Sequence, residues 1–169
     1  HDALPIFGAM LDAAEKPVIA FIAGDCVGGG CGLALAADIR VATPEARLGI
    51  TPANLGLVYP LHDTKLLVDL VGPGQAKRML FSGQLLSATE ALRVGLVEEL
   101  AESAEPLARL IAGKSAHSAR EIKAIVRRIV EGQSHDDAET LATFAAAFDG
   151  ADFAEGTAAF VTKRKPEFR

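Results

Sequence analysis

GDCVGGGCGLALAADIRVA, residues 24–42, contains three consecutive glycines, Gly28 to Gly30, followed by an alanine-rich segment. The run VIAFIAG comes just before it, and its β-branched residues between a proline and a glycine predict a buried strand. The segment after the glycines predicts a helix over about residues 29–37, and DIRVAT predicts the next strand. Strand, glycine turn, helix and strand in this order predict a β-α-β unit with a right-handed crossover. The stretch therefore indicates an α/β fold.

The remainder of the chain is predicted to be mostly helical. HDTKLLVDLVG predicts a helix that ends at Gly72, and Pro73 opens a second helix that Gly83 closes. Ser87 with Glu90 three residues later forms the pattern of a capping box. Short extended pieces are predicted at ARLGI and LVEEL, and long amphipathic helices follow to the end. The opening residues also predict a helix, and because the chain starts at His1 within that pattern, we expect a region upstream.

Composition narrows the classes of function. The chain has 169 residues, a formal net charge of −5, no tryptophan and one tyrosine, which disfavours a nucleic-acid partner. Its two cysteines cannot build a disulfide framework, and no ligand pattern for a metal accompanies them. A cytoplasmic location is therefore expected. No apolar run reaches the roughly 20 residues of a membrane span, so no membrane partner is predicted.

The glycine loop allows three interpretations. Glycines can permit tight packing of a helix on a strand without any ligand. They can also form a dinucleotide loop, although the spacing matches that motif only loosely. Finally, amides at a helix start can stabilise an oxyanion where negative charge develops. The glycines alone leave these alternatives open.

The surrounding sequence resembles the enoyl-CoA hydratase/isomerase (crotonase) superfamily. The resemblance begins in KPVIAFIAGDCVGGGCGLALAADIRVAT and continues through LGITPANLGLVYP and VGPGQAKRMLFSGQLLSATEALRVGLVEEL to EGTAAFVTKRKPEF. It implies a crotonase-like β-β-α spiral core in residues 1–100, as the C-terminal portion of that core, and a helical trimerisation region in residues 101–169. It further implies an acyl-CoA thioester as substrate, a homotrimer or hexamer, and no cofactor beyond the CoA part of the substrate.

The resemblance also assigns site residues. The amide of Gly29 is expected to donate to the thioester oxygen, with Gly28 beside it at the CoA thioester. Phe160 is expected near the adenine of CoA and Lys163 near a phosphate. The substrate pocket is expected to contain three further positions, namely Gly32, Pro52 and Leu55. The family's second oxyanion amide and most of its adenine pocket belong to a region upstream of the matched residues, which we expect this chain to lack.

Two of these positions depart from the water-adding members of the family. Such members carry glutamates where this chain has Gly32 and Pro52, and neither residue can transfer a proton. The segment TPANLG followed by Tyr59 is similar to the methylmalonyl-CoA decarboxylase branch, in which a tyrosine faces the substrate carboxylate. Tyr59 would then hold a carboxylate, or would simply cap a turn. His62 would protonate an enolate, or would be a solvated residue at a helix start beside Asp63.

The sequence thus predicts an acyl-CoA lyase or isomerase that stabilises a thioester enolate. Decarboxylase-like chemistry is favoured over hydration because both glutamates are replaced. The alternatives are an enoyl-CoA hydratase with non-standard residues and a non-catalytic CoA-binding homologue. Among neighbouring residues, Asp25 is expected to accept bonds from loop amides, and Cys31 is expected to be a small buried filler rather than an activated thiol.

Overall fold

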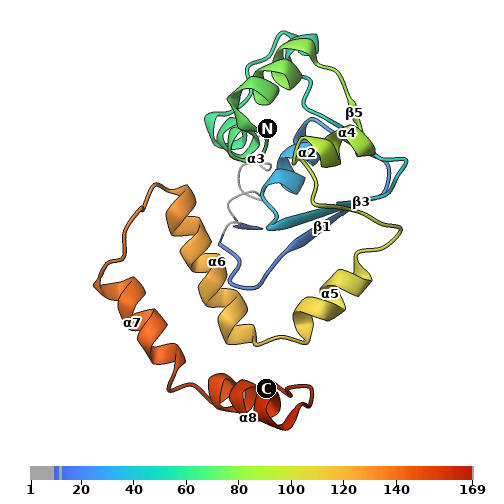
Figure 1. Cartoon of the computed structure of the whole chain (residues 1–169). Helices are drawn as coiled ribbons and strands as arrows, with labels where there is room; N and C mark the ends of the chain where they lie inside the picture. Colours follow the sequence, from blue (N-terminus) through green and yellow to red (C-terminus); the bar gives the residue numbers. More distant parts are fainter. Residues whose placement is uncertain (1–9, 12, 169) are drawn as a thin grey trace. The chain divides into compact units, whose positions relative to one another are not determined.

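The computed structural model describes residues 10, 11 and 13–168 (Figure 1). The predicted opening helix lies largely outside the described residues. The chain groups into two compact units. The first is centred on residues 18–104, and the second on residues 105–168 together with residues 15–17.

The first unit contains two small sheets within the described part of the chain. One sheet has the order β1-β3-β6 and is parallel throughout, and the other has the order β2-β4-β5, in which β2 and β4 are parallel and β4 and β5 antiparallel. The strands are β1 (Ile19–Ile22), β2 (Asp25–Val27), β3 (Ile39–Ala42), β4 (Arg47–Gly49), β5 (Leu86–Ser87) and β6 (Glu99–Leu100).

Helices follow the strands in a repeating β-β-α order. The helical elements of this unit are α2 (Gly29–Leu35), the 3-10 helix η1 (Pro52–Leu55), α3 (Leu61–Ser82) and α4 (Ala88–Arg93). Strands β1 and β2 precede α2, and β3 and β4 precede η1 and α3. Each pair therefore adds one strand to each of the two sheets. Figure 1 shows α2 beside β1 and β3. This is the β-β-α succession that the family resemblance implies, whereas the residue patterns alone predicted a β-α-β unit.

The first strand differs from its prediction. The sequence predicts a buried strand, but only Ile22 is buried, and Phe21 is 43% exposed. The physical reason is its place in the sheet, since among the described residues β1 pairs with β3 on one side only. Strand β2 is absent from the sequence prediction. It follows directly after Gly24, whose φ of 125° gives the sharp turn between β1 and β2 that other residues rarely adopt.

The predicted helix ends are confirmed. Helix α3 is interrupted at Gly72, where φ is 75° and ψ is 162°, and Pro73 begins its second half. The left-handed residue Gly83 ends it. Helix α4 opens with the predicted capping box between Ser87 and Glu90, whose side chains and backbone amides bond reciprocally.

The core of the first unit is apolar with one buried charge. Cys31 is fully buried in it, as expected of a small filler. Arg40 is 3% exposed, and its guanidinium donates to the carbonyl oxygen of Ala37 at 2.7 Å and to the carboxylate of Glu98. These bonds connect the end of α2, strand β3 and the segment before β6. The largest fully buried side chains are Leu48, Ile50, Leu67, Met79, Leu96, Val41 and Val97.

The second unit is helical. Its described helices are α5 (Glu105–Ala112), α6 (Ala116–Val130), α7 (Ala138–Ala147) and α8 (Ala151–Thr162). Ser115 caps α6 by accepting from the amide of Ser118, and its hydroxyl also donates to Asp152 in the first turn of α8. Three phenylalanines pack edge to face around the junction of α7 and α8, namely Phe144, Phe148 and Phe153.

Candidate functional site

The glycine turn, residues 28–30, joins strand β2 to α2. Gly28 is the N-cap of α2, with φ 59° and ψ −122°, and its N–H donates to the carbonyl of Gly49 in β4 at 2.9 Å. This backbone conformation is open to glycine and strained for residues with a side chain. Gly29 is the first residue of α2, so its N–H has no acceptor within the helix. The local geometry is therefore suited to an amide that binds an external oxygen.

Tyr59 reaches back to this turn. Its hydroxyl donates to the carbonyl of Gly28 at 3.4 Å, and the carboxylate of Asp63 lies near it on the same side of α2. Burial, followed by the negative charge of Asp63, raises the pKa of Tyr59 well above its ordinary value. The tyrosine therefore remains a neutral hydrogen-bonding group beside the glycine turn.

Gly32 is the point where Tyr59 and Asp63 meet α2. A β-carbon built on Gly32 would lie 2.7 Å from the hydroxyl oxygen of Tyr59 and 3.3 Å from Oδ2 of Asp63. A side chain at position 32 would have to displace the tyrosine. The structure thus places Gly32, Tyr59 and Asp63 together, and the space beside the missing glutamate holds another carboxylate.

Asp63 is the residue that the sequence interpretation missed as a functional group. The sequence indicates it only as a neighbour of His62 at a helix start. His62 has a half-exposed side chain, and its Nδ1 lies 3.1 Å from Oδ1 of Asp63, whose own side chain is 20% exposed. The proline at position 60 could have indicated from the sequence that Asp63 has a role other than capping. The N-cap of α3 is Pro60, which has no N–H, so Asp63 at the third helical position cannot close a capping box.

The other two expected pocket residues lie in η1. Pro52 opens this 3-10 helix, and Leu55 ends it with 73% of its side chain exposed. Between them, the amide of Asn54 donates to the carbonyl of Gly83 at 3.3 Å, which fixes η1 to the end of α3. Neither Pro52 nor Leu55 carries a group that could transfer a proton.

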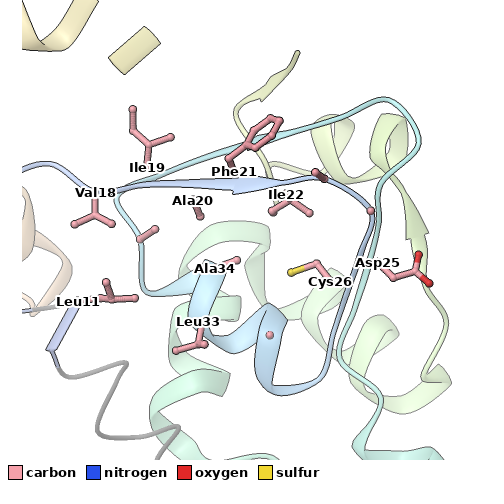
Figure 2. Close-up of a pocket in the computed structure, with 14 residues that line it drawn as sticks. Leu11, Val18, Ile19, Ala20, Phe21, Ile22, Asp25, Cys26, Leu33 and Ala34 are labelled. Atoms are coloured by element: carbon pink, nitrogen blue, oxygen red, sulfur yellow. The ribbon is translucent and has the colours of Figure 1, made fainter. Parts of the chain in front are cut away.

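A separate apolar pocket lies between β1 and the opposite face of α2 (Figure 2). Its volume is about 430 Å³, and α2 contributes Gly30, Leu33 and Ala34, which share one helix face. Gly32 lies about 200° around the helix from Gly30. The polar pair of Tyr59 and Asp63 therefore lies on the other side of α2 from this pocket.

Asp25, at the end of this pocket, does not have the role that the sequence predicted. Its carboxylate accepts from the guanidinium of Arg47 at 2.8 and 2.6 Å rather than from loop amides. The reason is the parallel pairing of β2 with β4, which sets Asp25 directly opposite Arg47. The hydrogen bond from Arg47 lowers the pKa of Asp25.

The two cysteines flank the glycines as free thiols. A hydrogen bond with Cys26, together with burial, raises the pKa of Cys31. A buried thiol with a raised pKa is not an activated nucleophile, which agrees with the expected filler role of Cys31.

The predicted CoA contacts belong to the second unit. Phe160 lies on α8 and is 85% exposed. Lys163 is the C-cap of α8 and adopts a left-handed conformation with φ 53°. The placement of these side chains at adenine and phosphate stays a prediction.

Neither a metal-ligand cluster nor a membrane-spanning helix is present among the described residues. No group of three or more His, Cys, Asp or Glu side chains among them is arranged to hold a metal ion. None of the helices they form is both long and apolar enough to cross a membrane.

Known sequences that are similar to this chain indicate one family. A family described as Enoyl-CoA hydratase/isomerase matches residues 9–169. Crotonyl-CoA hydratase of Syntrophomonas wolfei is 36% identical over 169 residues, covering 94% of this chain and 64% of the relative. Short-chain-enoyl-CoA hydratase of Clostridium acetobutylicum is 38% identical over 164 residues, covering 93% and 63%. The chain therefore spans slightly less than two thirds of the length of these relatives.

Solved structures agree on the fold. An enoyl-CoA hydratase/carnithine racemase from Magnetospirillum magneticum has a TM-score of 0.89 at 30% identity, covering 96% of this chain and 62% of that one. Enoyl-CoA hydratase from Bacillus anthracis has a TM-score of 0.82 at 30% identity, covering 98% and 68%. The predicted crotonase-like α/β fold with a helical C-terminal part is confirmed by these similarities.

Proposed function

Because this chain belongs to the enoyl-CoA hydratase/isomerase family, we propose that it is part of an enzyme that adds water across the double bond of a short enoyl-CoA thioester. The observation that carries the proposal is the similarity, at 36% and 38% identity, to relatives named crotonyl-CoA hydratase and short-chain-enoyl-CoA hydratase. The glycine turn at the start of α2 supports the same chemistry.

The glycine turn would stabilise the negative charge that develops on the thioester oxygen during the reaction. Addition of water at C3 moves an electron pair onto the thioester oxygen, and the N–H of Gly29 would donate to that oxygen as charge develops. Gly28 would allow the close approach of the backbone to the thioester. The proposal needs no cofactor other than the CoA part of the substrate.

Decarboxylation is less well supported than the sequence alone indicated. That preference rested on the loss of both glutamates and on Tyr59 as a holder of a substrate carboxylate. The names of the relatives favour hydration. In addition, Tyr59 already faces the carboxylate of Asp63. A malonyl-type carboxylate at the same hydroxyl would meet a like charge at close range, which is unfavourable.

The expected assembly and location are part of the proposal. Exposed apolar side chains on the helices of the second unit support association into a homotrimer or hexamer, and they include Leu110, Ile122, Ile129, Phe144, Phe160 and Val161. Phe160 and Lys163 would then take up the adenine and a phosphate of CoA. The free thiols of Cys26 and Cys31 support a reducing compartment such as the cytoplasm.

The test uses the protein at its full natural length with crotonyl-CoA and methylmalonyl-CoA, read by mass spectrometry. Gain of one water by crotonyl-CoA is expected. Loss of carbon dioxide from methylmalonyl-CoA, without hydration of crotonyl-CoA, would overturn the proposal in favour of the decarboxylase. Binding of both thioesters without turnover would overturn it in favour of the non-catalytic homologue.

A matched pair of variants tests the glycine turn in the same assay. Proline is tolerated at the first position of a helix and has no N–H. Gly29→Pro is therefore expected to lower kcat by about 100-fold or more. Gly29→Ala keeps the amide and reports the effect of an added side chain alone. Equal activity of the two variants would contradict the role of the Gly29 amide.

A further inference from the structure

Gly32 has no side chain, but the carboxylate of Asp63 lies beside it in the folded chain. Oδ2 of Asp63 would be 3.3 Å from a β-carbon at Gly32, and the carboxyl carbon 3.8 Å. Asp63 reaches this place from α3, a different element from the one that carries Gly32. The absence of a side chain at Gly32 is what leaves room for the hydroxyl of Tyr59, 2.7 Å from the same point.

The carboxylate is held by neighbours on both sides. Oδ1 is 3.1 Å from Nδ1 of His62, and the Tyr59 hydroxyl, from the loop before α3, lies beside the same point of α2 as Oδ2. The side chain is 20% exposed, so it is partly shielded while remaining within reach of a small molecule. A carboxylate in the first turn of α3 is also favoured by the helix dipole.

One common structural role of such an aspartate, the capping box, is excluded here. An acidic residue at the third helical position often accepts from the N–H of the N-cap. The N-cap of α3 is Pro60, which offers no N–H, and α3 has no side-chain capping bond. The orientation of Asp63 toward Gly32 is therefore not explained by a capping bond.

We infer that Asp63 is the acid–base group of the proposed hydration, replacing the glutamate that Gly32 lacks. The inference rests on the proposed function. Tyr59 and His62 act as positioning residues that orient the two carboxylate oxygens. The class of substrate is unchanged, but the proton is carried by a residue of α3 rather than of α2.

The steps balance with one carboxylate and one water. Asp63 accepts a proton from water while the water oxygen bonds to C3 of the enoyl group. The electron pair of the double bond moves to the thioester oxygen, where the N–H of Gly29 donates to it. The protonated Asp63 then gives its proton to C2, the enolate returns to the thioester, and the carboxylate is restored. Each turnover consumes one molecule of water, and the reaction needs no oxidant or other reactant.

The central experiment compares Asp63→Asn with Asp69→Asn in the full-length protein. Asp69 lies on the same helix and pairs with Lys65 at the surface, so it is a matched control for the loss of one carboxylate. Hydration of crotonyl-CoA and binding of the unreactive butyryl-CoA are measured for both. Asp63→Asn is expected to lower kcat by about 100-fold or more with butyryl-CoA affinity retained, whereas Asp69→Asn stays near wild type.

A further readout separates chemistry from folding. Formate added to Asp63→Ala is expected to restore part of kcat, because it can occupy the vacated space as a carboxylate.

The two proposals fail in different ways. A wild-type protein that hydrates crotonyl-CoA, together with an Asp63→Asn variant within threefold of its kcat, overturns the role of Asp63 alone. A wild-type protein that hydrates no enoyl-CoA overturns the proposed function, and the role of Asp63 with it. Loss of kcat without rescue by formate, with loss of butyryl-CoA binding, overturns the role of Asp63 in favour of a structural one.

Discussion

Arg40 and Glu98 are joined twice in the first unit. The backbone N–H of Arg40 donates to Oε2 of Glu98 at 2.6 Å, and its guanidinium, on a side chain only 3% exposed, donates to Oε1. Removal of the glutamate would leave a buried cation with part of its hydrogen bonding unmet. We therefore expect Glu98→Ala to lower the free energy of unfolding by about 2 kcal/mol, below the usual cost of breaking a buried pair because Glu98 is 40% exposed.

Urea denaturation of the full-length protein measures this cost. The exposed neighbour Glu99 provides the control, and Glu99→Ala is expected to change stability by about 0.5 kcal/mol or less. Unfolding midpoints that are equal in the two variants would contradict a structural role for the Arg40–Glu98 pair.

A β-carbon at position 32 is expected to destabilise the protein. Gly32→Ala would bring that carbon to 2.7 Å from the Tyr59 hydroxyl oxygen, so the tyrosine has to move. Overpacking of this kind costs about 1–3 kcal/mol. Gly74→Ala is the matched control, because Gly74 also lies in a helix and a β-carbon there would meet nothing within 4 Å outside that helix.

Thermal unfolding distinguishes the two substitutions. Alanine is favoured over glycine within a helix by roughly 0.5–1 kcal/mol, so Gly74→Ala is expected to keep or raise Tm while Gly32→Ala lowers it. An unchanged Tm in Gly32→Ala would mean that Tyr59 can leave its place at no cost.

The tyrosine predicts a stability change in alkali. Burial and the charge of Asp63 raise the pKa of Tyr59 in the folded chain, whereas an unfolded tyrosine ionises near pH 10. The stabilisation from its neutral form is therefore complete below about pH 10 and is lost as the pH rises above that value. We expect the unfolding free energy of the wild type to fall more steeply above pH 10 than that of Tyr59→Phe. Parallel curves for the two proteins would refute this.

The carboxylate of Glu155 in the second unit predicts a loss of stability in acid rather than in alkali. Hydrogen bonds from Arg164, and then from the backbone N–H of Glu167, lower the pKa of Glu155 to about 2 from an ordinary value of 4.5. The stabilisation is therefore present above pH 4.5 and is lost as the pH falls from 4.5 toward 2.

Circular dichroism during acid titration measures this effect. The wild type is expected to lose more stability across that range than Glu155→Gln, which carries no titrating group at this position. Glu102→Gln, at an exposed glutamate of the first unit, is the control and should follow the wild type. A Glu155→Gln profile that also follows the wild type would show that the pair with Arg164 adds nothing.

Much of the fold could be predicted from local patterns. The glycine breaks at Gly72 and Gly83 and the capping box at Ser87 depend on neighbouring residues, and all three are observed. Strand β2 was missed because three residues after a glycine give no periodicity. The burial of β1 was overestimated because local patterns do not show that, among the described residues, it pairs with β3 on one side only.

The candidate site could be predicted only in part. The sequence indicated Tyr59 as a residue that holds a substrate carboxylate or caps a turn, and its contact with the carbonyl of Gly28 is seen only in the structure. Asp63 was missed because its proximity to Gly32 arises from the packing of α3 against α2, which no local pattern reveals. The functional division into residues 1–100 and 101–169 stays a prediction, as do the contacts of Phe160 and Lys163 with CoA.

The crowding of Gly32 and Tyr59 has an evolutionary consequence. A side chain at position 32 can coexist with Tyr59 only if the tyrosine hydroxyl moves from its present place, so the two positions are coupled. In a lineage that exchanged a glutamate at position 32 for glycine, the loss of that side chain would have opened the space that the hydroxyl now occupies. A reconstructed ancestor that carries both side chains is therefore expected to hold Tyr59 in a different place.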